Sequence, residues 1–435
     1  MFSNLKQLFT KKNKDLRKRI YFTIFVLTIF VIGTTIAVPG THINEDLNKL
    51  GFLELLNIMG GGALKNFSIF ALGVTPYITA SIIIQLLQMD IIPYFTELSK
   101  QGHTGYQKLN QITRYVGIFF AFIQGYAMSF AFLGSTDVVN NLKISLILTG
   151  GTSFLLWLGD QVTQKGIGNG ISLLIMAGIV TSLPQMMIDA FRSLVVIGDT
   201  KTTAIGIGSF ILFILVYVLV IVGVVFIEGA ERKIPIQYAN KSTANLGKQT
   251  FLPIKINSAG VIPVIFASSL LSIPEIIARF IKKPGFSSFV DKYLNYTKPV
   301  GFILFIFFIY FFAYFYTFIQ MKPDDMAKNL QDNGGYIPGV KPGESTKKYI
   351  SQVLTRLTVV GALFLVIISA LPILLHAFTD LPATVTIGGT SLLIVVGVAI
   401  ETYKQLESSL TSRNYSENNN YHRRRRVVKQ WKILF

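Results

Sequence analysis

Long apolar runs without charged residues recur along this chain and are separated by polar segments. The first covers residues 20–38, and a membrane-spanning helix needs about 20 such residues. Ten runs of this kind lie near residues 20–38, 75–89, 114–134, 144–160, 171–188, 206–227, 259–280, 300–320, 353–376 and 384–401. Backbone groups that face lipid must be hydrogen-bonded within their own segment, and the runs are too long for tilted barrel strands. The pattern predicts an all-α membrane protein with ten transmembrane helices.

The composition argues against a set of soluble domains. Apolar residues make up 51% of the 435 residues, charged residues make up 14%, and the mean hydropathy is +0.53. Soluble domains carry about 25% charged residues. A basic segment precedes the first run, as in a signal peptide, but that run exceeds the usual apolar core of about 7–15 residues and many spans follow it. Cysteine is absent, which excludes disulfides, thiol catalysis and Cys-ligated metal centres.

The basic residues predict the orientation of the chain. Lys and Arg number 40 against 22 Asp and Glu, a net charge of +18. With a cytoplasmic amino terminus, about 30 Lys and Arg fall on the cytoplasmic side and about 10 on the other, as the positive-inside rule requires. Both termini are therefore predicted to be cytoplasmic. The external exception is the loop at 280–298, which carries Lys282, Lys283, Lys292 and Lys298.

Three segments do not fit a simple span-and-loop pattern. Residues 51–73 are apolar but short and broken by Gly60, Gly61 and Gly62. Irregular backbone at membrane depth is tolerated where protein buries it, so this segment suggests a re-entrant element, with an interfacial or external loop as the alternative. The cytoplasmic loops at 228–255 and 321–355 are rich in Lys, Arg, Gly and Pro and show no clear periodicity. Loops of this length are commonly functional.

The chain offers little catalytic chemistry. Its four histidines lack metal-ligand spacing, and the Gly166, Gly168 and Gly170 cluster follows no strand, which favours a tight turn entering a helix over a phosphate loop. We predict no cofactor, no metal and no nucleotide site, so energy from ATP would come from a partner. Ionisable residues are almost absent from the span interiors, where a transporter usually carries them. The polar residues there are uncharged and suit interhelical hydrogen bonds.

Five separated strings resemble the SecY/Sec61-alpha family, whose bacterial members form the centre of the Sec protein translocase. They are residues 70–87 (FALGVTPYITASIIIQLL), 166–172 (GIGNGIS), 259–269 (AGVIPVIFASS), 334–343 (GGYIPGVKPG) and 388–396 (GGTSLLIVV). They occur in the family's order, and the resemblance extends from about residue 15 to residue 410.

The resemblance implies ten transmembrane helices in two pseudo-symmetric five-helix halves around an hourglass pore, with a re-entrant plug. The implied divisions are a basic cytoplasmic segment (1–19), an N-terminal half with the plug at about 52–65 (20–188), an external hinge loop (189–205), a C-terminal half (206–401) and a basic cytoplasmic tail (402–435).

The resemblance also assigns residues to the conduit. The plug falls on Asn57, Ile58, Met59, Gly60, Gly61 and Gly62, and the pore ring on Val74, Ile78, Ile175, Ile265 and Ile394. A narrow aliphatic constriction dewets and blocks ions, and it can yield around a passing chain without demanding a particular substrate sequence. Without the resemblance, each of these residues would be an ordinary packed aliphatic side chain.

A lateral gate is implied between spans two and three on one side and seven and eight on the other. Thr79, Gln124 and Asn257 match a polar cluster at that gate, and such uncharged contacts between membrane helices are worth about 1 kcal/mol or less. Arg232, Lys233 and Lys341 match docking positions for a ribosome or a motor, although simple positive-inside topology would also account for them. Lys341 stands where the family commonly has arginine, which keeps the charge but loses the bidentate fork.

The implied function is that of the pore-forming subunit of the channel that moves unfolded preproteins across the bacterial plasma membrane and releases apolar segments sideways. The implied partners are SecE, SecG, the SecA ATPase, the ribosome with its RNA, signal-sequence-bearing polypeptides and anionic lipids. The tail at 423–426, four arginines without a family counterpart, suits lipid or topology anchoring, or ribosomal RNA. The alternatives are a secondary transporter of a small solute, disfavoured by the scarcity of intramembrane charge, and a membrane-embedded enzyme, for which no catalytic constellation is present.

Overall fold

The structure is a computed structural model that describes residues 14–39, 57, 60–64, 66–88, 92–133, 137–195, 200–238, 250–281, 284–295, 298–378 and 391–410. Each of the ten predicted spans overlaps a helix in this part of the chain, and residues 384–390 of the tenth lie outside the described residues. These helices are α2 (Lys14–Thr35), α4 (Thr75–Leu87), α6 (His103–Leu133), α7 (Val138–Lys165), α8 (Gly170–Leu194), α9 (Thr200–Gly229), α10 (Ile262–Ile281), α12 (Pro299–Gln320), α14 (Glu344–Phe378) and an unlabelled helix at 391–410.

Short helices lie in three of the predicted loops: α5 (Pro93–Lys100), α11 (Pro284–Tyr293) and α13 (Pro323–Asp332). Each begins with proline, whose missing N–H costs nothing in the first turn of a helix. By length and composition alone, five described helical segments can cross a membrane: Val138–Lys165, Gly170–Leu194, Thr203–Gly229, Pro299–Asp332 and Glu344–Leu371. Two shorter apolar segments, Thr75–Leu87 and Ile262–Leu271, belong to α4 and α10.

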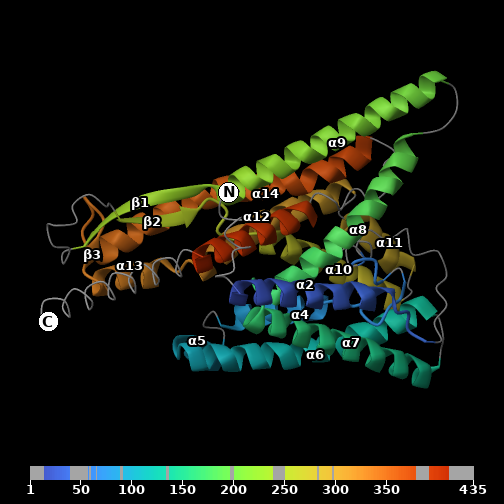
Figure 1. Ribbon diagram of the computed structural model, residues 1–435, viewed down its shortest axis with the longest axis horizontal. Coiled ribbons are helices and arrows are strands. Elements are labelled where there is room, and N and C mark those ends of the chain that lie inside the picture. Colours follow the sequence, from blue (N-terminus) through green and yellow to red (C-terminus); the bar gives the residue numbers. More distant parts are fainter. Residues whose placement is uncertain are drawn as a thin grey trace, which may run out of the picture.

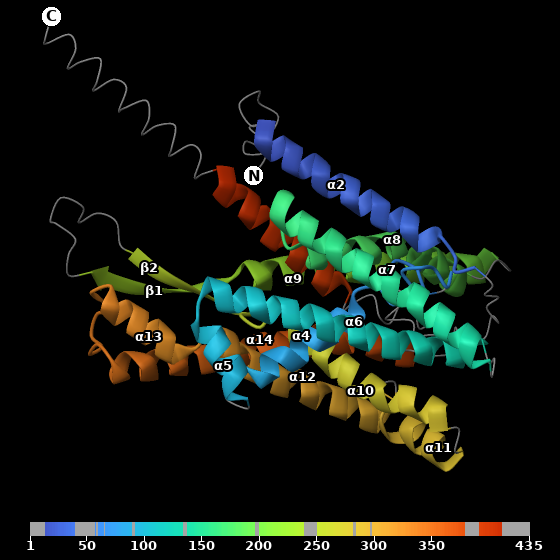
Figure 2. The ribbon, with the colours of Figure 1, turned by 90° about the horizontal axis from the view of Figure 1, so that it is seen from below.

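The helices form two groups that lie side by side (Figures 1 and 2). In the first, α6 packs against α4 and α7, and α2 packs against α7 and α8. In the second, α12 packs between α10 and α14, around a core that includes Ile309 and Leu365. Helices α8 and α9 join the groups in sequence, and α6 contacts α10 across the division.

The turn at residues 166–170 confirms that the glycine cluster leads into a helix. The Asn169 side chain caps α8 by accepting hydrogen bonds from the backbone N–H groups of Ile171 and Ser172. Gly170 lies against α7 so closely that a Cβ would come within 1.9 Å of the Gly159 carbonyl oxygen. The glycine at this position therefore permits the close packing of α7 on the start of α8.

The two long loops at 228–255 and 321–355 form one folded unit, called here the loop unit, which the sequence pattern did not predict. Strands β1 (Glu231–Tyr238) and β2 (Thr250–Lys255) make an antiparallel hairpin, and β3 (Gly335–Tyr336) from the second loop pairs with the other edge of β1. Ile234, Ile236 and Ile254 from the first loop pack against Leu330 and Ile350 from the second. The α13 helix and the start of α14 complete this unit at one end of the molecule (Figure 1).

Candidate functional site

The five predicted ring residues come together in one apolar cluster. Val74 precedes α4, Ile78 lies in α4, Ile175 in α8, Ile265 in α10, and Ile394 in the helix at 391–410. Val74, Ile175 and Ile394 are buried members of the cluster, and Ile78 and Ile265 are half-buried side chains packed against it. The cluster therefore joins helices from both groups, with aliphatic side chains at the place where they meet.

The glycine-rich segment after α2 packs among the helices. Within the turn, the N–H of Gly62 donates to the carbonyl of Asn57 at 2.8 Å, and the N–H of Ser68 donates to that of Ala63 at 2.8 Å. Ala63 is fully buried in the same cluster as the ring residues. This packing favours the re-entrant interpretation over an external loop. Ile58 and Met59, which the sequence analysis also assigned to the plug, lie outside the described residues.

The close contact between this segment and α8 is made by two glycines, Gly61 in the segment and Gly178 in α8. Gly61 adopts a left-handed conformation (φ +71°), and a Cβ built on it would lie 3.1 Å from the Cα of Gly178. Gly62 is also left-handed (φ +82°), but a Cβ there would meet no atom within 4 Å. Backbone meets backbone at Gly61 and Gly178, a contact that side chains on either residue would disturb.

The three predicted gate residues lie on the expected helices or next to them, but no hydrogen bond joins them to one another. The Thr79 hydroxyl in α4 donates to the Thr75 carbonyl at 3.2 Å. Gln124 is half-buried in α6. Asn257 precedes α10, and its amide donates to the Glu228 carboxylate at 2.6 Å and to the Gly260 carbonyl at 3.1 Å. Glu228, at the end of α9, is a residue that the sequence analysis missed because it stands at a span boundary.

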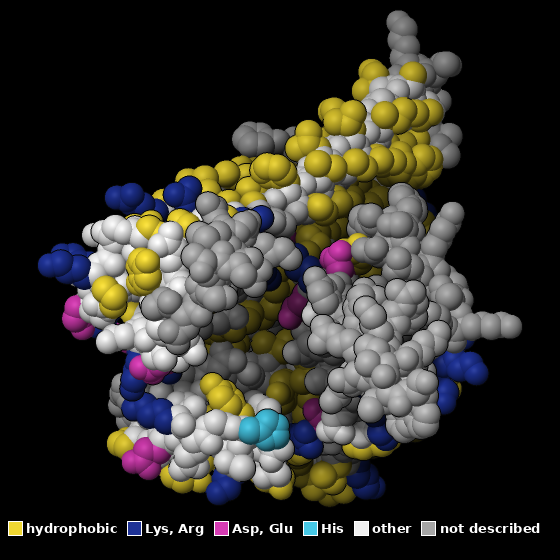
Figure 3. Space-filling view, turned by 60° about the vertical axis from the view of Figure 1, so that its left-hand side comes forward, with side chains coloured by type: hydrophobic (Ala, Val, Ile, Leu, Met, Phe, Trp, Pro, Cys, Tyr) yellow, Lys and Arg dark blue, Asp and Glu magenta, His cyan; other side chains and the backbone are white. Residues whose placement is uncertain are grey.

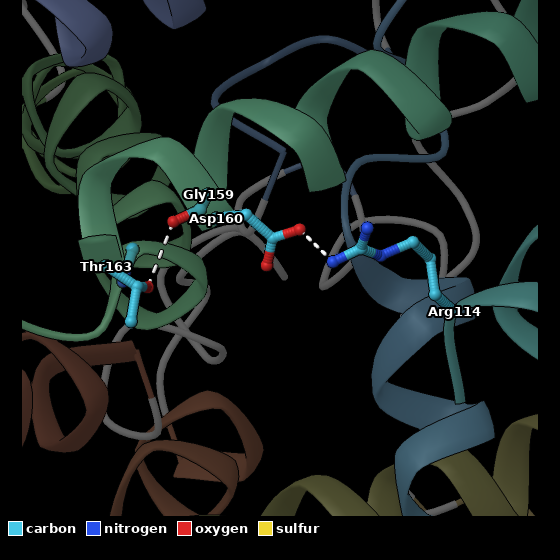
Figure 4. A network of polar contacts seen from close by, with 5 residues as sticks. Arg114, Gly159, Asp160 and Thr163 are labelled. Carbon is cyan, nitrogen blue, oxygen red and sulfur yellow. Dashed lines mark hydrogen bonds and ion pairs between the residues drawn. The ribbon is translucent and has the colours of Figure 1, made fainter. Parts of the chain in front are cut away.

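An ion pair between α6 and α7 joins Arg114 to Asp160 (Figure 4). Both residues lie at ends of their predicted spans, which is consistent with span interiors almost free of charge. Close to it, the Thr163 hydroxyl donates to the Gly159 carbonyl at 3.0 Å and accepts from the N–H of Gly170 at 2.9 Å. These contacts hold α6, α7 and the start of α8 together on one side.

The three predicted docking residues lie on the loop unit, at the end of the molecule that the positive-inside rule predicts to be cytoplasmic. Arg232 and Lys233 are exposed in β1, and Lys341 is exposed in the turn after β3. Lys and Arg side chains surround this end of the molecule, and hydrophobic side chains line a recess in the same view (Figure 3). The Glu231 carboxylate accepts a hydrogen bond from Lys404 at 2.9 Å, and this bond lowers the pKa of Glu231. The bond ties β1 to the helix at 391–410.

Comparison with known proteins identifies the family to which this chain belongs. The SecY family model matches residues 68–403. The protein translocase subunit SecY of Staphylococcus epidermidis is 48% identical over 428 residues, which covers 95% of this chain and 99% of the relative. The protein of the same name from Staphylococcus aureus is 48% identical over 417 residues, covering 93% of this chain and 96% of the relative.

Solved structures support the fold. A structure described as "The structure of a protein conducting channel" superposes with a TM-score of 0.64 at 20% identity, covering 91% of this chain and 93% of that chain. Sec61 in a canine ribosome-channel complex from the endoplasmic reticulum gives 0.61 at 18% identity, with the same coverage. The predicted fold class, ten helices in two halves, is confirmed by this likeness. The chain is thus a multi-pass membrane protein that belongs to the SecY family.

Proposed function

We propose that this chain is the central subunit of a protein-conducting channel, which moves unfolded preproteins across the bacterial plasma membrane and releases apolar segments sideways into the bilayer. The observation that carries the proposal is that the aliphatic side chains of Val74, Ile78, Ile175, Ile265 and Ile394 belong to one apolar cluster, which joins helices of both groups. It makes no directional bonds, so it can close against ions and still yield to chains of any sequence. The staphylococcal relatives carry the name of a protein translocase subunit, which supports the same function.

The proposed role is conduction and gating, without catalysis. In the resting state, the segment around Gly61 rests on α8 beside the ring and closes the conduit. A signal sequence opens the channel by separating α4 and α6 from α10 and α12, and a sufficiently apolar segment then leaves through this opening into lipid. Contact between α6 and α10 supports this division, because the two helix groups meet there at a distance in sequence from the hinge between α8 and α9.

The proposed partners follow from the surfaces that the fold leaves open. Arg232, Lys233 and Lys341 would meet the SecA motor or ribosomal RNA, whose phosphates attract basic side chains. The apolar surface of α9 includes Leu219 and Phe226, which are 64% and 74% exposed, and it would be covered by lipid or by the SecE and SecG subunits. Both termini are proposed to be cytoplasmic, where the basic tail would meet anionic lipid.

An import assay tests the proposed function. The chain is copurified with its small subunits, reconstituted in vesicles, and given the ATPase motor and an unfolded preprotein; we expect ATP-dependent protection of the preprotein from added protease. Changing Arg232, Lys233 and Lys341 together to Glu should reduce import about tenfold, because three attractive charges become repulsive. The matched control changes Lys292 and Lys298, on the opposite side, and should leave import unchanged. Uptake of a small solute without import of preprotein would instead support a secondary transporter.

The Gly61 contact predicts a difference between two neighbouring alanine variants. Gly61→Ala and Gly62→Ala both place a side chain on left-handed backbone, which costs about 1–2 kcal/mol. Only Gly61→Ala also pushes against Gly178, so it should release the plug more readily. One further kcal/mol changes the released population about fivefold. Conductance of vesicles at rest measures the effect, and equal leaks from the two variants would contradict the seating of the plug on α8.

A further inference from the structure

A buried carboxylate lies beside the segment that leads into α10. Glu228, the penultimate residue of α9, is 8% exposed, and Asn257, five residues before α10, is 4% exposed. Their side chains meet at 2.6 Å, with the Asn257 amide donating to the Glu228 carboxylate. A hydrogen bond to a charged group is stronger than one between neutral groups, and removing one partner leaves the other buried without it.

The bond lies where four elements converge. The backbone N–H of Ile256 donates to the Ala230 carbonyl at 3.1 Å, which closes the base of the β1–β2 hairpin beside it. Helix α14 packs closely against the same segment: a Cβ built on Gly361 would lie 2.8 Å from the Ile256 carbonyl oxygen. The hydrogen bond from Lys404 to Glu231 connects the helix at 391–410 to the start of β1 at the same place. Tightly packed backbone transmits a displacement instead of absorbing it.

Burial raises the pKa of Glu228 above its ordinary value. The hydrogen bond from Asn257 and the charges of Lys255 and Lys404 oppose this rise, and Glu401 adds to it. Glu228 is also close in sequence to the proposed docking residues: Arg232 follows four residues later in β1, and Asn257 follows the end of β2 by two residues. A movement of the hairpin therefore reaches both members of the bond directly.

We propose that Glu228 is a latch residue: its bond to Asn257 holds α10 in the closed position, and displacement of the docked hairpin releases it. This inference rests on the proposed function, because α10 is a gate helix only in a channel of that kind. It assigns Asn257 a partner in α9 in place of Thr79 and Gln124. It also couples docking at β1 to the lateral gate. The coupling runs through the connection between α9 and β1, which carries Glu228, and through the connection between β2 and α10, which carries Asn257.

Exchange of the two side chains tests the latch. Asn257→Asp places a second carboxylate against Glu228 and should open the gate most, whereas Glu228→Gln keeps a weaker neutral hydrogen bond and should open it less. The double variant, Glu228→Gln with Asn257→Asp, restores an amide–carboxylate bond with the roles reversed. It should return the gate close to its original state, as expected for directly interacting residues. Glu401→Gln is the matched control, since it removes a neighbouring acid and leaves the bond intact.

Gate position is read from the rate of disulfide formation between one cysteine placed in α6 and one in α10. The chain has no cysteine of its own, so this pair is the only one. We expect Asn257→Asp to slow the reaction about tenfold or more, and the double variant to recover most of the rate. The melting temperature, measured on the same samples, reports a merely structural role, which would lower it without a selective change in the cross-linking rate.

The outcomes separate the latch from the proposed function. An unchanged disulfide rate in Asn257→Asp, or a slow rate that the double variant does not recover, overturns the latch. The import assay on the unaltered chain decides the proposed function independently, because it uses neither residue. If the unaltered chain imports preprotein and the gate is unaffected in Asn257→Asp, the proposed channel function is supported and the latch role of Glu228 is contradicted.

Discussion

Replacing Ile78, Ile175 and Ile265 together with glycine is expected to make resting vesicles leak ions. The three side chains come from α4, α8 and α10 and pack in the cluster where the two helix groups meet. Their removal leaves space that water can fill, and a wetted constriction conducts where a dry one does not. We expect conductance to rise by about an order of magnitude or more, measured as ion flux in vesicles without motor or substrate.

The control for this variant keeps the volume and the chemistry of the ring. Large-to-small changes at buried sites cost about 2–5 kcal/mol each, so the glycine variant has to be shown folded, by its melting temperature and by binding of its small subunits. Changing the same three residues to leucine conserves volume and should keep the seal. If a folded glycine variant conducts no more than the unaltered protein, these residues do not seal the channel against ions.

Cross-linking α6 to α10 is expected to stop import almost completely. These helices belong to different groups and are in contact, so a short bridge between cysteines at facing positions holds the groups together. A signal sequence could then no longer enter between them. Import of a preprotein into vesicles, before and after reduction of a disulfide bridge, measures the effect. Because the chain contains no cysteine, the introduced pair is the only target.

A bridge within one group is the matched control for the gate. Helices α6 and α7 pack against each other in the same half, and Arg114 and Asp160 already join them. A disulfide between them should leave import unchanged, since opening requires no movement there. Normal import through a channel bridged between α6 and α10, with bridging shown to be complete, would contradict the lateral gate.

The spans could be predicted from the sequence, because an uncharged apolar run of about 20 residues matches the thickness of the hydrocarbon core of a bilayer. The turn before α8 could also be predicted, since Asn169 provides the cap and Gly170 the close approach. Periodicity could not show that Val74 and Ile394 come together in the fold, because many aliphatic residues along these helices have the same pattern. The resemblance to a family selected them, and the fold places them in one cluster.

The three-stranded sheet and the Glu228 contact could not be predicted from the sequence. Ile234 and Ile236 alternate with exposed residues in β1, which is the period of a strand, but the pattern is short and contains Pro235. The partner strand β3 has only two residues and comes from a distant loop. Glu228 is an acid at a span boundary, 29 residues from Asn257 in sequence, and only the folded chain brings the two side chains together.

The most direct test of the central claim is to find where a translocating polypeptide contacts this chain. A preprotein stalled in the vesicle membrane by a folded domain at its end is given photoreactive groups along its length, and the adducts are mapped. We expect adducts at Ile78, Ile175, Ile265 and Ile394 from the stretch of preprotein within the membrane, and none at Leu219 on the exposed face of α9. Adducts at Leu219 without any at the ring would contradict a conduit through the centre of the molecule.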